Sequence, residues 1–86
     1  MIISWTTHAW EDYLYWQKKD KIILKRINLL INNIIRTPFD GLGKSEALRF
    51  ELAGQWSRRI NEEHRLVYKY EDKIETVIII QCRYHY

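Results

Sequence analysis

The end of the chain places an imidazole and two phenols directly after a strongly apolar run. The run Val77–Ile80 is rich in β-branched residues, which are typical of a β-strand, and it leads into the sequence Cys82–Tyr86. Because a terminus without such an anchor is usually mobile, we expect the strand to hold His85 in a defined position. His85 is then a candidate for proton transfer near neutral pH.

Arginines and a carboxylate upstream could complete a site around this histidine. Successive side chains of a strand point to opposite faces of the sheet, so the polar residues of neighbouring strands can share one face. Such a face could gather Arg49, Arg59, Arg65 and His85. Glu46 lies in the loop that enters the same sheet and could reach its rim.

These residue types fit the cleavage of an RNA phosphodiester by the neighbouring 2′-hydroxyl. The reaction needs a base for the 2′-proton, an acid for the leaving 5′-oxygen, and cations for the charge that builds on phosphorus. Glu46 can serve as the base and His85 as the acid, while an arginine such as Arg65 binds two phosphate oxygens at once and stays protonated. The spacing of the three histidines does not indicate a shared metal ion, so we expect neither a metal nor another cofactor.

Each of these side chains also has a purely structural interpretation. Glu46 could be an exposed loop carboxylate, and Arg65 could form a weak surface ion pair with Glu63 or Glu51. His64 is expected at a strand edge rather than in catalysis. The terminal tyrosines could cover the core, and Cys82 is expected to be an inert buried thiol. The tryptophans are expected in the core or at an interface: Trp5, Trp10, Trp16 and Trp56.

Two helices are predicted in the first half of the chain. Thr6 or Thr7 can cap a helix that runs to about Gln17, since a threonine oxygen accepts a first-turn N–H. Asp20 is a second N-cap and opens a longer helix, whose apolar residues recur at helical spacing. Pro38 ends this helix because the residue before a proline is pushed out of the helical conformation.

Five strands are predicted around these helices, with hairpin turns at residues 53–55 and 71–73. The expected ranges are Met1–Trp5, about Leu48–Leu52, Trp56–Ile60, Arg65–Glu71 and Glu75–Tyr84. In the second of these, alternation would turn Leu48, Phe50 and Leu52 toward the core. The order β-α-α-β-β-β-β predicts an α+β fold, with two N-terminal helices packed on a mainly antiparallel sheet.

Composition is compatible with one domain over residues 1–86. Hydrophobic residues make up 47% of the 86 positions, which is enough for a core. The single Cys82 cannot form an intramolecular disulfide, which favours a reducing, cytoplasmic setting. No secretory signal or membrane-spanning run is expected, so we expect a protein that acts away from the membrane.

The basic residues are concentrated in one segment of the chain. The net charge is only +3. Five basic residues lie between positions 44 and 65: Lys44, Arg49, Arg58, Arg59 and Arg65. A basic face suits a polyanion such as RNA, but four glutamates in the same segment could also make it an ordinary solvated surface.

Five segments of the chain carry distinctive motifs. The clearest are WSRRI at Trp56–Ile60 and EEHRLVY at Glu62–Tyr68. Three shorter segments are Asp12–Trp16, Thr37–Phe39 and Cys82–Tyr86. Together they resemble one known family, the YoeB/Txe toxins of the RelE superfamily, and the resemblance covers essentially the whole chain in order. It implies a RelE-like fold and the toxin of a type II toxin–antitoxin pair, an endoribonuclease that cleaves mRNA in the ribosomal A site and so inhibits translation.

The resemblance also implies partners. These are the ribosome and its mRNA, and a YefM/Axe-like antitoxin with an N-terminal DNA-binding part and a C-terminal segment that wraps the toxin. Operator DNA would be bound only through the antitoxin complex, and a homodimer is compatible with the family.

Roles follow from the matching motif positions. Glu46 resembles the family's general base and His85 its general acid. The implied catalytic set is Glu46, Arg65, His85 and Tyr86, and the implied substrate-binding set is Lys44, Arg49, Arg59 and Glu63. Ser45 and Ala47 stand where the family has prolines, which predicts a less rigid loop around the base.

Two other functions stay open at this point. A ParE-like relative of the same fold would poison gyrase by binding, without cleaving RNA, although the terminal His85 and Tyr86 and the arginine-rich strands argue against it. A binding subunit that acts mainly in autoregulation with its antitoxin is the other.

Overall fold

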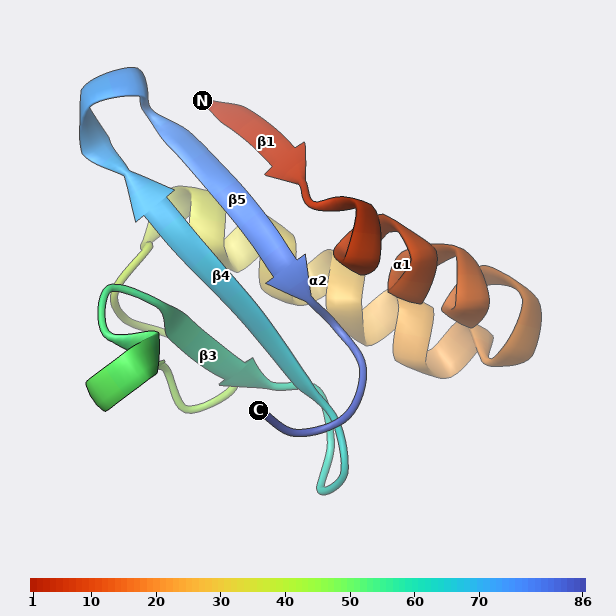
Figure 1. The fold of residues 1–86 in the computed structure, drawn as a ribbon. Coiled ribbons are helices and arrows are strands. Elements are labelled where there is room, and N and C mark those ends of the chain that lie inside the picture. The colour runs from red at the N-terminus through yellow and green to blue at the C-terminus, as the bar shows by residue number, and fades with distance from the viewer.

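Two helices and five strands make up the structure, a computed structural model that describes residues 1–86 (Figure 1). The first half contains β1 (Ile2–Trp5), α1 (Thr7–Lys19) and α2 (Lys21–Arg36). The second half contains β2 (Glu46–Ala47), β3 (Trp56–Arg59), β4 (Arg65–Glu71) and β5 (Thr76–Gln81). Two short 3-10 helices lie at Phe50–Leu52 and Asp72–Ile74.

The helix boundaries follow from the predicted caps. The Thr6 hydroxyl accepts a hydrogen bond from the Ala9 N–H at 3.0 Å, and Asp20 Oδ1 accepts from the N–H groups of Ile22 and Ile23 at 3.0 and 3.2 Å. These side chains satisfy first-turn donors that have no partner within the helix. The second helix ends before Pro38, as predicted, while the first runs two residues beyond Gln17.

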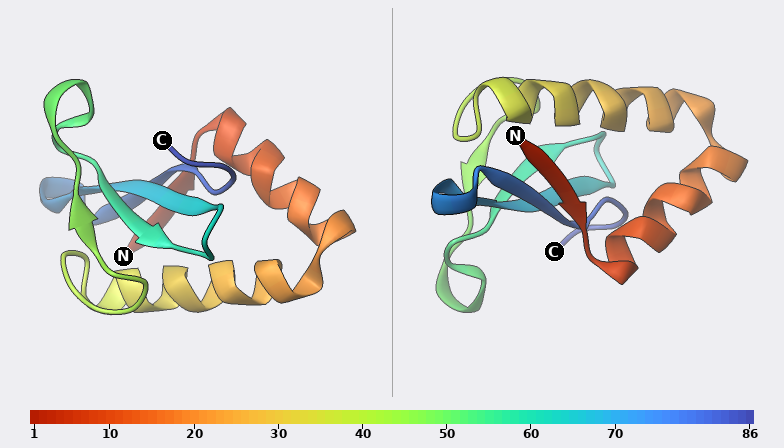
Figure 2. Two further views of the ribbon diagram at one scale, coloured as in Figure 1. Left: turned by 90° about the horizontal axis from the view of Figure 1, so that it is seen from below. Right: turned by 90° about the horizontal axis from the view of Figure 1, so that it is seen from above.

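The five strands form one sheet in the order β1-β5-β4-β3-β2. Strand β1 pairs with β5 in parallel, and every other pairing is antiparallel. Both helices pack on this sheet, and Figure 2 shows them meeting at the turn between them with the strands inside the angle that they form. The α+β fold with a mainly antiparallel sheet is therefore confirmed. Neither helix is long and apolar enough to cross a membrane.

The core lies between α2 and the central strands. Ile27, Leu30 and Ile34 of α2 are fully buried, and so are Leu66 and Tyr68 of β4. The last two residues are two positions apart, so they lie on the same face of β4. Each fully buried aliphatic side chain of this kind contributes roughly 1.5–3 kcal/mol relative to exposure.

The strand predicted at residues 48–52 is wrong. Strand β2 ends at Ala47, and the Leu48 N–H donates to the Gln55 carbonyl at 2.9 Å. The chain must reverse between these two residues, so it forms a 3-10 turn instead of a strand. Leu48 is buried, but Phe50 is 91% exposed and has a φ of +57°, which turns its ring away from the core.

The last strand also ends earlier than predicted, at Gln81 instead of Tyr84. Residues 82–86, which we call the tail, leave the sheet because α1 captures the first of them. The Cys82 N–H donates to Asp12 Oδ2 at 3.1 Å, and the Cys82 carbonyl accepts from Trp16 Nε1 at 2.8 Å. The tail then returns beside the end of β3 (Figure 1).

Candidate active site

A cleft of about 390 Å³ lies where the loop before β2, strand β3 and the tail meet. It is lined by Lys44, Ser45, Glu46, Ser57, Arg59, Arg65, His85 and Tyr86. The pairing of Glu46 with Ser57 across β2 and β3 sets one wall, and the returning tail sets the other. Six of the eight predicted site residues therefore lie together, and Arg49 and Glu63 are the two that do not line this cleft.

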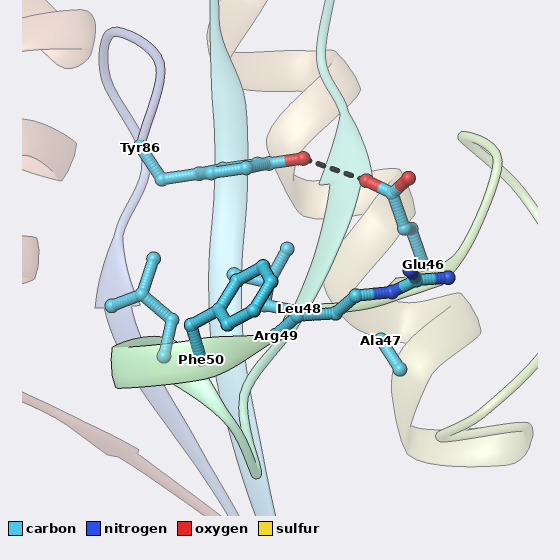
Figure 3. Close-up of a pocket in the computed structure, with 7 residues that line it drawn as sticks. Glu46, Ala47, Leu48, Arg49, Phe50 and Tyr86 are labelled. Atoms are coloured by element: carbon cyan, nitrogen blue, oxygen red, sulfur yellow. Dashed lines mark hydrogen bonds between the residues drawn. The ribbon is translucent and has the colours of Figure 1, made fainter.

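Glu46 and Tyr86 form the closest side-chain contact in the cleft. The Tyr86 hydroxyl donates to Glu46 Oε1 at 2.6 Å, and both side chains are exposed (Figure 3). This hydrogen bond to the carboxylate raises the pKa of the Tyr86 phenol above its ordinary value, with a smaller contribution from desolvation. One oxygen of Glu46 is therefore already bound to a hydroxyl group.

Arg65 is buried beneath the cleft and is fixed by backbone carbonyls. Its Nη1 donates to the carbonyls of Asn61 and His64 at 2.6 and 3.1 Å, with a longer contact to Glu62 at 3.3 Å. No ion pair joins Arg65 to either glutamate that could have neutralised it. Since Nη1 carries all of these bonds, the other guanidinium nitrogens keep their donors for a ligand in the cleft.

His85 and Tyr86 reach the cleft from the tail. Their rings lie 5.1 Å apart, and both side chains are exposed to solvent. Cys82, where the tail begins, is fully buried, and burial raises the pKa of its thiol to about 12. The thiol therefore stays protonated, which agrees with the prediction that it is inert.

The two predicted residues outside the cleft lie in different surroundings. Arg49 lines a neighbouring pocket of about 290 Å³, together with Leu48, Phe50 and other residues. Figure 3 shows Tyr86 on one side of this pocket and the three residues Leu48, Arg49 and Phe50 on the other. Glu63 is exposed, with Oε1 3.6 Å from His64 Nε2, and does not reach either pocket.

Arg58 is a residue whose structural role the sequence interpretation missed. It is fully buried, and its guanidinium donates five hydrogen bonds. The acceptors are the Tyr68 hydroxyl, Asn33 Oδ1 and the carbonyls of Thr37, Asp40 and Leu42. The strand alternation that placed Arg59 on the polar face puts Arg58 on the core face, and this signal could have found it.

No group of three His, Cys, Asp or Glu side chains in the structure could hold a metal ion. The cleft offers instead a carboxylate, an imidazole, a phenol and at least two guanidinium groups. Such a set can bind a phosphate and move protons at its ester oxygens.

Comparison with known proteins decides the family. Residues 5–86 match the family model of the YoeB-like toxin of bacterial type II toxin–antitoxin systems. The chain belongs to this family. The toxin YoeB of Escherichia coli K12 is 55% identical to it over 86 residues, which cover all of both chains.

Solved structures of YoeB-like toxins have the same fold. A YoeB/ParE toxin from Agrobacterium tumefaciens matches with a TM-score of 0.97 and 49% identity over all of both chains. The toxin in a heterotetrameric YoeB–YefM complex from Staphylococcus aureus matches with a TM-score of 0.90 and 45% identity, over all of this chain and 98% of the other. The resemblance that the sequence motifs indicated is therefore confirmed at the level of the family and the fold.

Proposed function

We propose that this YoeB-like toxin is an endoribonuclease that cleaves mRNA in the A site of the ribosome and so stops translation. The observation that carries the proposal is the convergence of a carboxylate, a buried arginine and an imidazole on one cleft: Glu46, Arg65 and His85. These residues come from three separate parts of the chain, and RNA cleavage by the 2′-hydroxyl uses each of their chemistries.

The reaction would proceed by acid–base catalysis. Glu46 takes the proton of the 2′-hydroxyl, the 2′-oxygen bonds to phosphorus, and the bond from phosphorus to the 5′-oxygen breaks. His85 gives its proton to the leaving 5′-oxygen, so the products are a 2′,3′-cyclic phosphate and a 5′-hydroxyl. Arg65 stabilises the charge on the phosphoryl oxygens through the donors that its backbone contacts leave available.

Tyr86 occupies the position that the substrate needs. Its hydroxyl lies 2.6 Å from Glu46 Oε1, which is the distance expected of a hydroxyl whose proton a carboxylate would take. The incoming 2′-hydroxyl would replace it or use the second carboxylate oxygen. Tyr86 can then donate its own hydrogen bond to the substrate.

The surroundings of the cleft suit RNA. Lys44 and Arg59 line it, and Arg49 lies in the adjoining pocket, so phosphates on either side of the cut meet positive charge. The exposed ring of Phe50 in that pocket offers a surface on which an unstacked base can pack. Glu63 does not line the cleft, and its carboxylate lies beside His64 instead.

We infer that an antitoxin controls this site. The Staphylococcus aureus relative has been solved in complex with YefM, and an exposed basic cleft invites an acidic segment that folds on binding. We propose a YefM-like partner, a cytoplasmic location, and contact with operator DNA only through the antitoxin complex. Amide hydrogen exchange with and without antitoxin tests this, because the inference requires slower exchange in the tail or in β3.

Cleavage of mRNA on programmed ribosomes tests the enzymatic proposal. The purified protein should produce a cut in the A-site codon, mapped by primer extension, and His85→Ala should not. DNA supercoiling by gyrase, measured with the same preparation, is the test of the ParE-like alternative. Inhibition of gyrase without any cut on the ribosome would overturn the proposal.

A further inference from the structure

The backbone of Tyr84 is held by hydrogen bonds at both its N–H and its carbonyl, just before the tail enters the cleft. The Tyr84 N–H donates to His64 Nδ1 at 2.7 Å, and the Tyr84 carbonyl accepts from the Arg65 N–H at 2.9 Å. Tyr84 also has a φ of +64°, a left-handed conformation that costs a bulky residue energy unless its surroundings impose it. These two hydrogen bonds are therefore the contacts that fix the bend.

His64 is well placed to hold this bend because it is itself immobilised. Asn61 Oδ1 accepts from the His64 N–H at 2.7 Å, and only 6% of His64 is exposed. Its ring packs edge-on against Trp16, with the ring centroids 4.8 Å apart. Trp16 in turn donates to the carbonyl of Cys82, so one aromatic pair anchors both the start of the tail and its bend.

The tautomer of His64 follows from this contact. Nδ1 accepts a hydrogen bond, so the ring proton is on Nε2. The Nε2 atom lies 3.6 Å from Glu63 Oε1, an orientation in which the carboxylate favours that tautomer. Glu63 therefore contributes to the orientation of His64 and does not line the cleft.

Beyond Tyr84 the tail is held to the rest of the chain by the hydrogen bond from Tyr86 to Glu46. His85 follows Tyr84 directly, and one residue spans at most about 3.6 Å of chain. A shift of the Tyr84 backbone therefore also displaces His85. A catalytic group that is displaced by about 1 Å can lose roughly 100-fold in rate.

We propose that His64 is a positioning residue for the cleavage reaction. Its Nδ1 accepts a hydrogen bond from the Tyr84 N–H, and this contact positions His85 and Tyr86 in the cleft. The proposal rests on the proposed function for its effect on rate. Its effect on the tail is independent of that function. His64 itself does not line the cleft.

Two substitutions separate the acceptor from the bulk of the ring. In His64→Asn the side-chain oxygen branches from the same carbon as Nδ1 and can still accept from Tyr84, although the ring is lost. In His64→Leu the apolar volume is kept and the acceptor is lost. As a control, Tyr13→Phe removes a 2.6 Å hydrogen bond to Asn28 between the two helices, away from the tail.

The expected result has two parts. In His64→Leu, the Tyr84 amide should exchange faster while core amides such as that of Ile79 keep their protection, and Tyr86 should lose its raised phenol pKa. Single-turnover cleavage on the ribosome should fall roughly 10–100-fold with ribosome affinity unchanged. His64→Asn should restore most of the rate and the protection, and Tyr13→Phe should resemble the wild type in both measurements.

Three results would overturn the proposal. One is wild-type exchange at Tyr84 in His64→Leu, another is a wild-type rate in that variant, and the third is a rate in His64→Asn as low as in His64→Leu. The amide exchange of Tyr84 and the phenol pKa of Tyr86 are measured without RNA, so they test the role of His64 in holding the tail even if the wild-type protein does not cleave. In that case the proposed function is wrong, but the role of His64 in holding the tail still stands.

Discussion

The hydroxyl of Tyr86 lies 2.6 Å from a carboxylate oxygen of Glu46, forty residues earlier in the chain. In the free protein the candidate base is thus already paired with a hydroxyl donor. This contact ties the tail to β2 and orients the Glu46 carboxylate. The contact involves only one carboxylate oxygen, so the site is ordered before any substrate arrives and Oε2 stays available to it.

The acid and the base should each be needed for cleavage. Glu46→Ala and His85→Ala should slow single-turnover cleavage on programmed ribosomes by about 10²–10⁴-fold each, because each removes one proton transfer. Glu11→Ala and His8→Ala are matched controls, since both residues are exposed on α1 and line neither the cleft nor the pocket beside it. A near-wild-type rate in Glu46→Ala or His85→Ala would remove that residue from the mechanism.

Arg65 should not be replaceable by lysine. One nitrogen of its guanidinium is used by the carbonyls of residues 61 and 64, and the others have no hydrogen-bond partner within the protein. A lysine has a single nitrogen and cannot bind both the carbonyls and a ligand, so Arg65→Lys should cleave nearly as slowly as Arg65→Ala. Arg49→Lys should keep most of the activity, because a phosphate contact at the rim needs only charge. Full single-turnover activity of Arg65→Lys would show that Arg65 does not need to bind the backbone carbonyls and the ligand at the same time.

The Tyr86–Glu46 contact should depend on pH in one direction. The phenol pKa is raised in the folded protein, so this contact is fully present below the ordinary tyrosine pKa near 10 and is lost as pH rises through the higher folded value. NMR titration of the Tyr86 ring should show the raised pKa, and Glu46→Gln should lower it, because the hydrogen bond to the charged carboxylate is its largest cause. An unchanged pKa in Glu46→Gln would contradict this assignment.

Of two adjacent arginines, Arg58 should be needed for stability of the fold and Arg59 for binding. Arg58→Ala leaves several carbonyls without a donor and empties a buried volume, so the free energy of unfolding should fall by about 2–5 kcal/mol. Arg59→Ala removes an exposed side chain, so stability should change by less than about 0.5 kcal/mol while ribosome binding weakens. Urea denaturation and ribosome co-sedimentation measure the two effects. Equal losses of stability in Arg58→Ala and Arg59→Ala would contradict the assignment of a structural role to Arg58 alone.

Removal of His85 and Tyr86 should abolish activity and leave the fold intact. Both side chains are exposed and contribute nothing to the core, so the melting temperature should stay within a few degrees of the wild type. Growth after induced expression without antitoxin is the measurement of toxicity. Growth arrest by the shortened protein at equal expression would show that His85 is not the essential acid.

The elements that the sequence predicted well are those with a local physical cause. Thr6 and Asp20 mark the helix starts because capping needs only a side-chain oxygen three residues before an unpaired N–H. The core face of β4 follows from simple alternation of Leu66 and Tyr68. The meeting of Arg59 and Arg65 also follows from alternation, since they lie on neighbouring predicted strands and pair directly across them. His85 reaches the cleft through the tail, which alternation did not predict.

The errors arose where distant contacts override local pattern. Alternating Leu48, Phe50 and Leu52 fit a strand, but the early pairing of Leu48 with Gln55 forces a turn and exposes the phenyl ring. The last strand stops at Gln81 because two residues of α1, about 70 positions earlier, bind the next peptide. No local signal in residues 48–52 or 82–86 reports these partners.

The position of β5 inside the sheet has a consequence for synthesis. This strand lies between β1 and β4, yet it is made after both of them, and the tail follows it. A nascent chain can form the hairpin of β3 and β4 early, but β1 has no partner until β5 has emerged. The cleft can then be completed only after β5 and the tail have been made. A chain that lacks β5 or the tail would therefore carry no assembled cleft, so the protein cannot act through this cleft until both have been made.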